Sequence, residues 1–499
     1  MTATTAPATF YGHPRGLATL FFTEFFERFS YYGMRALLVL FLTAAVAKGG
    51  LGVDDATAGS IYGIYTGAVY LFALPGGWIA DRLIGTRRSI WYGGIIIASG
   101  HFLLAITSSM FSFMCGLLII ALGTGLLKPN ISTLVGELYE GKPGAFRDSG
   151  FSIFYMGINL GGMIAPLVSG TVGEMFNFRW GFLTAGVAML LGLIQFRATS
   201  HHLGAAGFAP KNTNPAERTR GLRLLGLAVL IGIALVTAAG MGLYTVSAPV
   251  VAAVFKHLLL AIAVLYFGYI LLFGGLNGTE KRRVGVMIVL FLCSAMFWAG
   301  FEQAGSTFNL FARDLTDRTF LGSYFATGEH PTTWYQSFNS ICIILLAPFF
   351  AWLWLALGKR NLDPSAPVKF GLGLVMLGAG FAVLLFAAKL ILATGGKVGP
   401  IWLLLTYLLH TTGELCLSPV GLSSFTKLAP TRYASQLMGM WFLATAMGNL
   451  AAGQIGGQIG SDVHTMPAEF LHMTMYGVGC GLLLLLFTPV LRRWMGGIH

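Results

Sequence analysis

The stretch LATLFFTEFFERFSYYGMRALLVLFL, residues 17–42, is long enough to cross a membrane as a helix, yet it carries four charged side chains. On membrane-insertion scales each charge at the bilayer centre costs roughly 2.5–3.5 kcal/mol, so four cost about 12 kcal/mol. The thirteen Leu, Val and Phe residues of the stretch return only about 6 kcal/mol. This helix is therefore not expected to face lipid on all sides. Its charges should line a polar interior, which in a polytopic protein is usually a pathway for a solute or an ion.

The composition extends this interpretation to the whole chain. Of the 499 residues 56% are hydrophobic and 10% are charged, whereas a soluble domain carries about 25% charged residues. Long apolar runs give fourteen candidate spans, at 17–47, 57–80, 90–108, 111–134, 150–175, 180–197, 221–241, 250–275, 284–311, 333–357, 369–393, 400–425, 433–459 and 470–491. The sequence predicts an all-α integral membrane protein with fourteen transmembrane helices.

The net charge of +12 is explained by this topology and does not indicate a nucleic-acid partner. If the N-terminus is cytoplasmic, 21 Lys and Arg residues fall in cytoplasmic segments and five fall outside, while the other five lie within spans. Cytoplasmic loops of membrane proteins carry such an excess of positive charge. We therefore expect a multi-pass protein with both termini in the cytoplasm.

A long polar interruption at 198–220 divides the spans into six, two and six. The predicted parts are a six-helix bundle at 1–197, a cytoplasmic linker with two inserted transmembrane helices at 198–283, and a second six-helix bundle at 284–499. Two six-helix halves suggest a pseudo-two-fold axis along the membrane normal, with the binding site at the midplane between the halves.

Other classes of protein find little support. The five cysteines are scattered one per apolar segment, without the spacing of a disulfide framework or a metal site (Cys115, Cys293, Cys342, Cys416 and Cys480). We find no H-E-x-x-H, no G-x-S-x-G and no Gly-rich phosphate loop, so we expect no enzyme, no metal and no cofactor. A channel is disfavoured because charge pairs that occlude a site suit alternating access better than an open pore. The sequence gives no prediction of the oligomeric state.

The charges of the first span share one face of the helix. At 100° per residue, an arc of about 140° contains Glu24, Glu27, Arg28, Tyr31, Tyr32 and Arg35. Glu24 and Arg28 have the i,i+4 spacing, with the acid first, that favours an ion pair. One stripe thus combines carboxylates that can exchange protons, permanent guanidinium charges and phenolic hydroxyls.

Three further charges lie inside apolar spans. Lys128 lies in mid-span before Pro129, where its ammonium cannot easily reach the interface, and Glu302 and Glu414 are isolated acids of the second half. Each acid needs a partner or must take up a proton. Cations in the first half and acids in the second make a dipolar site, which fits a zwitterionic peptide with its carboxylate toward the first half.

Three stretches of the sequence resemble motifs of known families. The loop GGWIADRLIGTRR, residues 76–88, resembles the cytoplasmic loop of the major facilitator superfamily. EFFERFSYYG at 24–33 and FYMGINLG at 154–161 are similar to two signatures of the proton-dependent oligopeptide transporter (POT) family. The resemblance implies a major facilitator fold in the bacterial cytoplasmic membrane. It implies a symporter that imports di- and tripeptides with protons, the coupling ion, by alternating access.

The resemblance and the charges together predict the functional residues. Proton coupling is assigned to Glu24, Glu27, Arg28 and Glu302. Substrate binding is assigned to Arg28, Tyr31, Tyr32, Arg35, Tyr70, Lys128, Asn159, Trp298, Asn339, Glu414, Ser418, Trp441 and Thr445. Two charge pairs are predicted gates: Arg35 with Glu302 outside, and Lys128 with Glu414 inside. The alternative is a major facilitator carrier for another small anion, such as nitrate.

Overall fold

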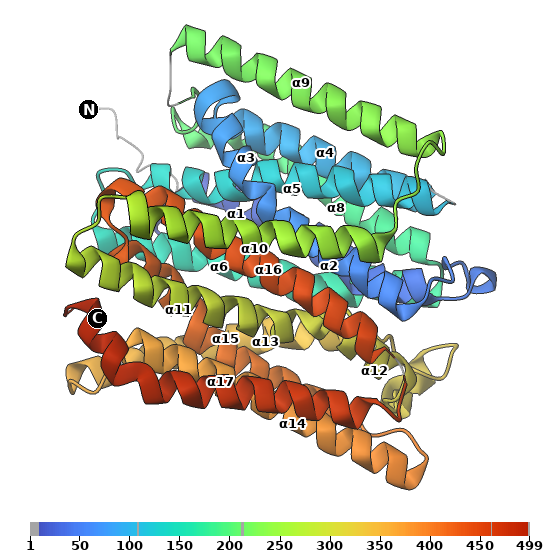
Figure 1. Cartoon of the computed structure of the whole chain (residues 1–499). Helices are drawn as coiled ribbons and strands as arrows, with labels where there is room; N and C mark the ends of the chain where they lie inside the picture. The colour runs from blue at the N-terminus through green and yellow to red at the C-terminus, as the bar shows by residue number, and fades with distance from the viewer. Residues whose placement is uncertain (1–8, 107–108, 211–213, 461, 498–499) are drawn as a thin grey trace, which may run out of the picture. The chain divides into compact units, whose positions relative to one another are not determined.

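The computed structural model describes residues 9–106, 109–210, 214–460 and 462–497, and this part of the chain is predominantly helical (Figure 1). The predicted span 90–108 and the three predicted parts each include a few residues outside these ranges. At the start, β1 (Thr9–Phe10) and β2 (His13–Pro14) pair as a short antiparallel hairpin.

The helices follow one another with short connections. Those of the first half and the linker are α1 (Gly16–Thr43), η1 (Val46–Lys48), α2 (Asp55–Leu71), α3 (Ala73–Ile79), η2 (Ala80–Ile84), α4 (Thr86–Ile106), α5 (Met110–Leu138), α6 (Gly144–Ala165), η3 (Pro166–Gly170), α7 (Thr171–Met175), α8 (Phe178–Thr199), η4 (Ser200–Leu203), α9 (Pro215–Gly240) and α10 (Ala248–Phe273). Those of the second half are α11 (Gly278–Phe301), η5 (Glu302–Gly305), α12 (Thr307–Asp314), η6 (Thr319–Tyr324), α13 (Trp334–Lys359), α14 (Ala366–Thr394), α15 (Ile401–Leu428), η7 (Thr431–Tyr433), α16 (Ala434–Ile459) and α17 (Met466–Met495).

The predicted spans correspond to these helices. Within the described ranges, eleven continuous or broken helices are long and apolar enough to cross a membrane. Three more, α1, α15 and α16, have 28, 28 and 26 residues. Together they match the fourteen predicted spans one for one, so the prediction of an all-α protein with this number of long helices is confirmed.

Three of the spans are broken, which the apolar runs do not reveal. The second is α2, α3 and the π-helical turn η2, the fifth is α6, the π-helical turn η3 and α7, and the ninth is α11, η5 and α12. Proline explains two breaks, because Pro75 and Pro166 have no backbone N–H to donate to the preceding turn. The break at Glu302 contains no proline and has another cause.

Contacts group the chain into two compact units, each described by itself below. Unit 1 comprises Met1–Leu37 and Leu71–Val246, and unit 2 comprises Leu38–Tyr70 and Ser247–His499. Most of α2 falls in unit 2 because glycines let it approach α16 closely. A methyl group on Gly59 would lie 2.4 Å from the carbonyl oxygen of Gly453. The two predicted inserted helices are divided between the units, α9 in unit 1 and α10 in unit 2.

Each unit has a core of long helices in side-by-side contact. In unit 1, α4 packs against α5 and α8, and in unit 2, α14 packs against α15 and α17 (Figure 1). The apolar part of α9 buries none of its residues against the described protein. A helix that is apolar and exposed on all sides requires lipid around it.

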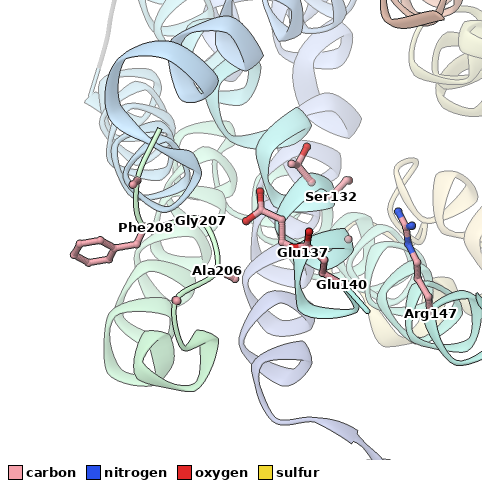
Figure 2. A pocket seen from close by; sticks show the side chains of 11 residues that line it. Ser132, Glu137, Glu140, Arg147, Ala206, Gly207 and Phe208 are labelled. Carbon is pink, nitrogen blue, oxygen red and sulfur yellow. The ribbon is translucent and has the colours of Figure 1, made fainter. Parts of the chain in front are cut away.

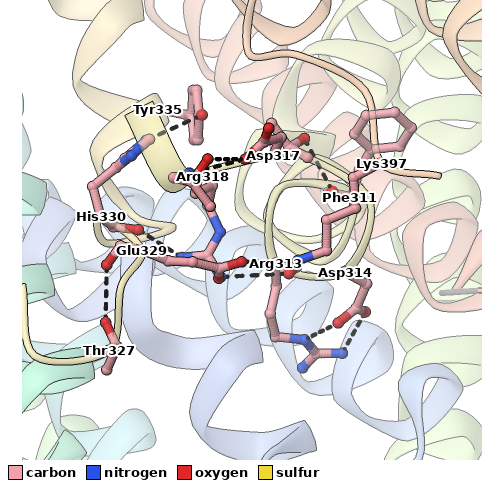
Figure 3. Close-up of polar contacts among 12 residues, drawn as sticks. Phe311, Arg313, Asp314, Asp317, Arg318, Thr327, Glu329, His330, Tyr335 and Lys397 are labelled. Carbon is pink, nitrogen blue, oxygen red and sulfur yellow. Dashed lines mark hydrogen bonds and ion pairs between the residues drawn. The ribbon is translucent and has the colours of Figure 1, made fainter. Parts of the chain in front are cut away.

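A polar cluster fixes the connection between α12 and α13 in unit 2 (Figure 3). Arg318 donates to the carbonyl oxygen of His330 at 2.6 Å and pairs with Glu329 at 2.5 Å, and Lys397 Nζ lies 3.0 Å from the other oxygen of Glu329. Partial burial opposes ionisation of Glu329, but the hydrogen bond from Lys397 and the charge of Arg318 outweigh it and hold the pKa of Glu329 below its usual 4.5.

Candidate functional site

The stripe on α1 folds into a buried ion cluster in unit 1. Arg28 Nε lies 3.1 Å from Glu24 Oε1 and donates a hydrogen bond to Glu27 Oε2. Glu24, Glu27 and Arg28 are 3%, 0% and 4% exposed, so these charges are withdrawn from solvent. Removing one partner of a buried ion pair leaves an uncompensated charge, which makes the three side chains depend on one another.

On α1 the cluster contains two acids and one base. Two carboxylates face one guanidinium, and Lys128 on α5 adds a second positive charge within electrostatic range of Glu24. Among the residues that the structure describes, Glu24 Oε2 and Glu27 Oε1 are buried and accept no hydrogen bond, and Arg28 Nη2 donates none. The cluster can therefore take a proton on a carboxyl oxygen and can offer Nη2 to an incoming carboxylate.

Aromatic rings continue the stripe toward the other end of α1. The guanidinium carbon of Arg28 lies 5.1 Å from the ring centroid of Tyr31, and that of Arg35 lies 5.8 Å from the ring of Tyr32. Tyr31 and Tyr32 contact each other edge to face at 5.2 Å. Cation–π contacts of this kind stabilise a buried guanidinium without neutralising its charge, so that the charge still acts on a bound anion.

The motif on α6 is explained by its contact with α1. A methyl group on Gly161 would lie 2.6 Å from the carbonyl oxygen of Phe25 and 3.0 Å from Arg28 Cβ, so the absence of a side chain allows α6 to lie against the ion cluster. Asn159, on the same helix, is buried and donates from Nδ2 to the carbonyl oxygen of Tyr155 at 3.0 Å.

Lys128 lies within an unbroken helix, although Pro129 follows it. The next residue, Asn130, is 3% exposed and donates from Nδ2 to the carbonyl oxygens of Leu126 at 2.7 Å and of Gly76 at 3.2 Å. This amide supplies hydrogen bonds at the turn where proline supplies none. Asn130 is not among the predicted residues, although an Asn directly after a proline inside an apolar run is a usable signal in the sequence.

In unit 2 the structure brings two predicted residues together. Asn339 on α13 donates from Nδ2 to Glu414 Oε2 on α15 at 3.1 Å and to Thr411 Oγ1 at 2.9 Å. Both Asn339 and Glu414 are half-buried. A neutral amide donor orients a carboxylate and leaves its charge in place, so Glu414 can still attract a cation.

Glu302 lies where the ninth span breaks. α11 ends at Phe301, and Glu302 begins the 3-10 turn η5, with its side chain 5% exposed. Trp298, one turn earlier, packs edge to face on Phe301 at 5.3 Å and lies against Gly448 of α16. Broken helices in membranes occur where the backbone is enclosed by protein or lines a cavity.

The remaining predicted residues also lie in unit 2. Trp441 is 5% exposed, packs against Phe425 with ring centroids 5.3 Å apart, and covers Gly421. Thr445, one turn later on α16, is buried and donates to the carbonyl oxygen of Trp441 at 3.4 Å. Ser418 and Tyr70 are half-buried, on α15 and on α2.

Comparison with known proteins identifies the family. A family model described as the POT family matches residues 87–466. The chain belongs to the POT family. The peptide transporter YePEPT of Yersinia enterocolitica is 42% identical over 507 aligned residues, which cover 99% of this chain and 98% of the relative. The di-/tripeptide transporter of Lactococcus lactis subsp. cremoris is 38% identical over 503 residues, 98% of each chain.

Solved structures agree with this assignment. The crystal structure of a peptide transporter POT in complex with sulfate aligns with a TM-score of 0.90 at 43% identity, covering 99% of this chain and 98% of that chain. The predicted family, peptide transport and major facilitator fold are confirmed, and the POT chain is a multi-pass membrane protein of a transporter family.

The lining of a cleft of about 920 Å³ in unit 1 contains none of the predicted POT site residues (Figure 2). It is bordered by the C-terminal end of α5, the start of α6 and the turn 205–209. Arg87, from the facilitator loop, holds this turn by donating to the carbonyl oxygens of Ala206 at 2.6 Å and of Gly204. The loop motif thus anchors the segment that follows η4.

Proposed function

We propose that this chain imports di- and tripeptides together with protons across the bacterial inner membrane, with both termini in the cytoplasm. Two findings support this function: its relatives are peptide transporters, and Glu24, Glu27 and Arg28 form a buried cluster. Such a cluster has too many carboxylates for its cations unless a proton or a nearby Lys shares the site. A merely structural ion pair requires only one acid.

Peptide recognition is divided by charge. In unit 1, Arg28 Nη2 has no described acceptor and is proposed to bind the peptide carboxylate, with Arg35 and Lys128 adding positive charge. In unit 2, Glu414, oriented by Asn339, is proposed to bind the peptide ammonium. Hydrogen bonds to the two charged ends of a peptide read its backbone, which implies tolerance toward side chains.

The pocket for those side chains is proposed to involve Trp298, Trp441 and Thr445, with Tyr70, Asn159 and Ser418 as polar contacts. Trp441 is tightly packed on α15, with the edge of its indole against Gly421. The assignment rests on the resemblance to the family and on the position of these side chains on α2, α6, α11, α15 and α16.

The gates are proposed as Arg35 with Glu302 on the outer side and Lys128 with Glu414 on the inner side. Protonation of Glu302, or of a member of the Glu24/Glu27 pair, would remove one charge of a pair and bias a closed gate toward opening. A peptide carboxylate competing for Arg28 or Lys128 would act in the same way. One proton crossing roughly 150 mV supplies about 3.5 kcal/mol, enough for a concentration ratio of a few hundred.

The test is uptake of radiolabelled dialanine into proteoliposomes under an inward proton gradient and an inside-negative potential. Accumulation above equilibrium that an uncoupler abolishes is the expected result. Absence of peptide uptake by folded protein, with nitrate moving instead, would support the alternative of an anion carrier. The carboxylate of Glu414 argues against that alternative, because an acid in the site repels anions.

A further inference from the structure

The break at Glu302 is held by hydroxyl groups from two other helices of unit 2. Tyr62 Oη on α2 donates to the backbone carbonyl oxygen of Glu302 at 2.9 Å, and Tyr407 Oη on α15 donates to that of Ala304 at 3.5 Å. Gln303 donates from Nε2 to the carbonyl oxygen of Ala299 at 3.2 Å. A helix end inside a membrane needs such donors, because no lipid can satisfy its carbonyl groups.

Tyr62 is the more tightly placed of the two tyrosines. Its side chain is 0% exposed, and a methyl group on Gly305 would lie 2.5 Å from its hydroxyl oxygen. The ring therefore fills the space that the missing side chain of Gly305 leaves at the end of η5. The fit is specific for a planar ring with a donor at its tip.

We propose that Tyr62 is a positioning residue for proton coupling: it fixes the break that presents the Glu302 carboxyl group, and Tyr407 assists it. This inference rests on the proposed role of Glu302. One hydrogen bond joins α2 to the turn that carries Glu302, so a movement of α2 would also move that turn. Tyr407 also joins the same turn to α15, the helix that carries Glu414 two turns later.

The helices packed against η5 carry few charged residues. α16, packed against η5, contains no ionisable residue, while α11 and α12 carry their charged residues at Glu280–Arg283 and at Arg313–Asp314, their far ends. On α15, His410 directs Nε2 to the carbonyl oxygen of Leu377 at 3.0 Å. Arg35 is the proposed gate partner of Glu302.

The test is Tyr62→Phe, which keeps the ring against Gly305 and removes only the hydroxyl group. Thr66→Val is the matched control, because Thr66 is equally buried on α2 and its hydroxyl donates only within that helix, to Tyr62 and Gly63. Both variants are measured in proteoliposomes for proton-driven dialanine uptake and for counterflow exchange, which needs no proton gradient.

We expect Tyr62→Phe to lower proton-driven uptake about threefold to tenfold, the value of one hydrogen bond, with counterflow unchanged. Thr66→Val should leave uptake and counterflow as in the wild type.

Equal behaviour of Tyr62→Phe and the wild type would overturn the inference, as would equal losses in uptake and counterflow. If Tyr62→Phe does not fold, Tyr407→Phe must lower proton-driven uptake by a smaller factor and leave counterflow unchanged. Wild-type uptake in Tyr407→Phe would then overturn the inference. Failure of the wild type to accumulate peptide refutes the proposed function instead, so the two failures are distinguishable.

Discussion

Unit 1 and unit 2 handle buried charge in different ways. In unit 1 the charges compensate one another on a single helix, because Glu24 and Glu27 both form ion pairs with Arg28 Nε. In unit 2, Asn339 on another helix donates to the carboxylate of Glu414, and Tyr62 donates to the backbone carbonyl oxygen of Glu302. A neutral donor orients a carboxylate without removing its charge, whereas a cluster of opposite charges on one helix changes its net charge when a proton enters.

Loss of Arg28 tests the unit 1 side and should have the largest effect. Arg28→Leu leaves two buried carboxylates without their cation, a loss of about 3–5 kcal/mol of stability. We expect a lower unfolding temperature by scanning fluorimetry and no uptake. Glu27→Gln in the same background should restore part of the unfolding temperature, and an Arg28→Leu protein as stable as the wild type would show that the cluster is not mutually dependent.

Glu302→Gln tests whether the acid of the broken helix couples protons. Because the amide cannot take up a proton, proton-driven uptake should fall more than about tenfold while counterflow persists. Uptake is measured at several external pH values, and the variant should lose the pH dependence. Wild-type rates under a proton gradient would exclude this role for Glu302.

Substitutions at the Asn339–Glu414 pair should change affinity more than turnover. Hydrogen bonds to charged groups contribute about 1.5–3 kcal/mol, so Glu414→Gln should raise the KM for dialanine roughly tenfold to a hundredfold. Asn339→Ala should have a smaller effect in the same direction, because the carboxylate is retained but less well oriented. An unchanged KM in both variants would remove Glu414 from the peptide site.

Gly161→Ala tests the close approach of α6 to the ion cluster. A methyl group there meets Phe25 and Arg28, and overpacking of this kind costs about 1–3 kcal/mol. Gly144→Ala on the same helix is the control, since a methyl group there meets nothing within 4 Å. The expected result is a lower unfolding temperature for Gly161→Ala alone, and equal unfolding temperatures would contradict the packing argument.

The smallest effect is expected at Glu329, outside the membrane-spanning helices. Its pKa is lowered in the folded protein, so its ion pairs stabilise the fold above the usual pKa of 4.5 and are lost as the pH falls through the lowered value. Pairs this exposed contribute about 0–1 kcal/mol. Glu329→Gln should unfold at a slightly lower temperature than the wild type near pH 7 but not near pH 3. An equal difference in unfolding temperature at both pH values would contradict the role of the ionised carboxylate.

The two units also differ in how much of them the sequence could predict. The fourteen spans follow from apolar length, and the stripe on α1 follows from helical spacing, since its members lie on one helix. The Asn339–Glu414 contact joins residues 75 positions apart and is not predicted by the sequence; the family resemblance only assigns both residues to substrate binding. The sequence contains no signal for the helix break at Glu302, because the apolar run continues through it. Its main hydrogen-bond donor, Tyr62, lies on a helix 240 positions away in the sequence. The gate pairs stay predictions.

The most direct test of the divided site compares dialanine with N-acetyl-dialanine as competitors of uptake, in the wild type and in Glu414→Gln. If unit 2 binds the ammonium, the wild type should strongly prefer dialanine, and Glu414→Gln should lose most of that preference while still requiring a free carboxylate. A Glu414→Gln protein that keeps the wild-type preference for the free amine would contradict the account.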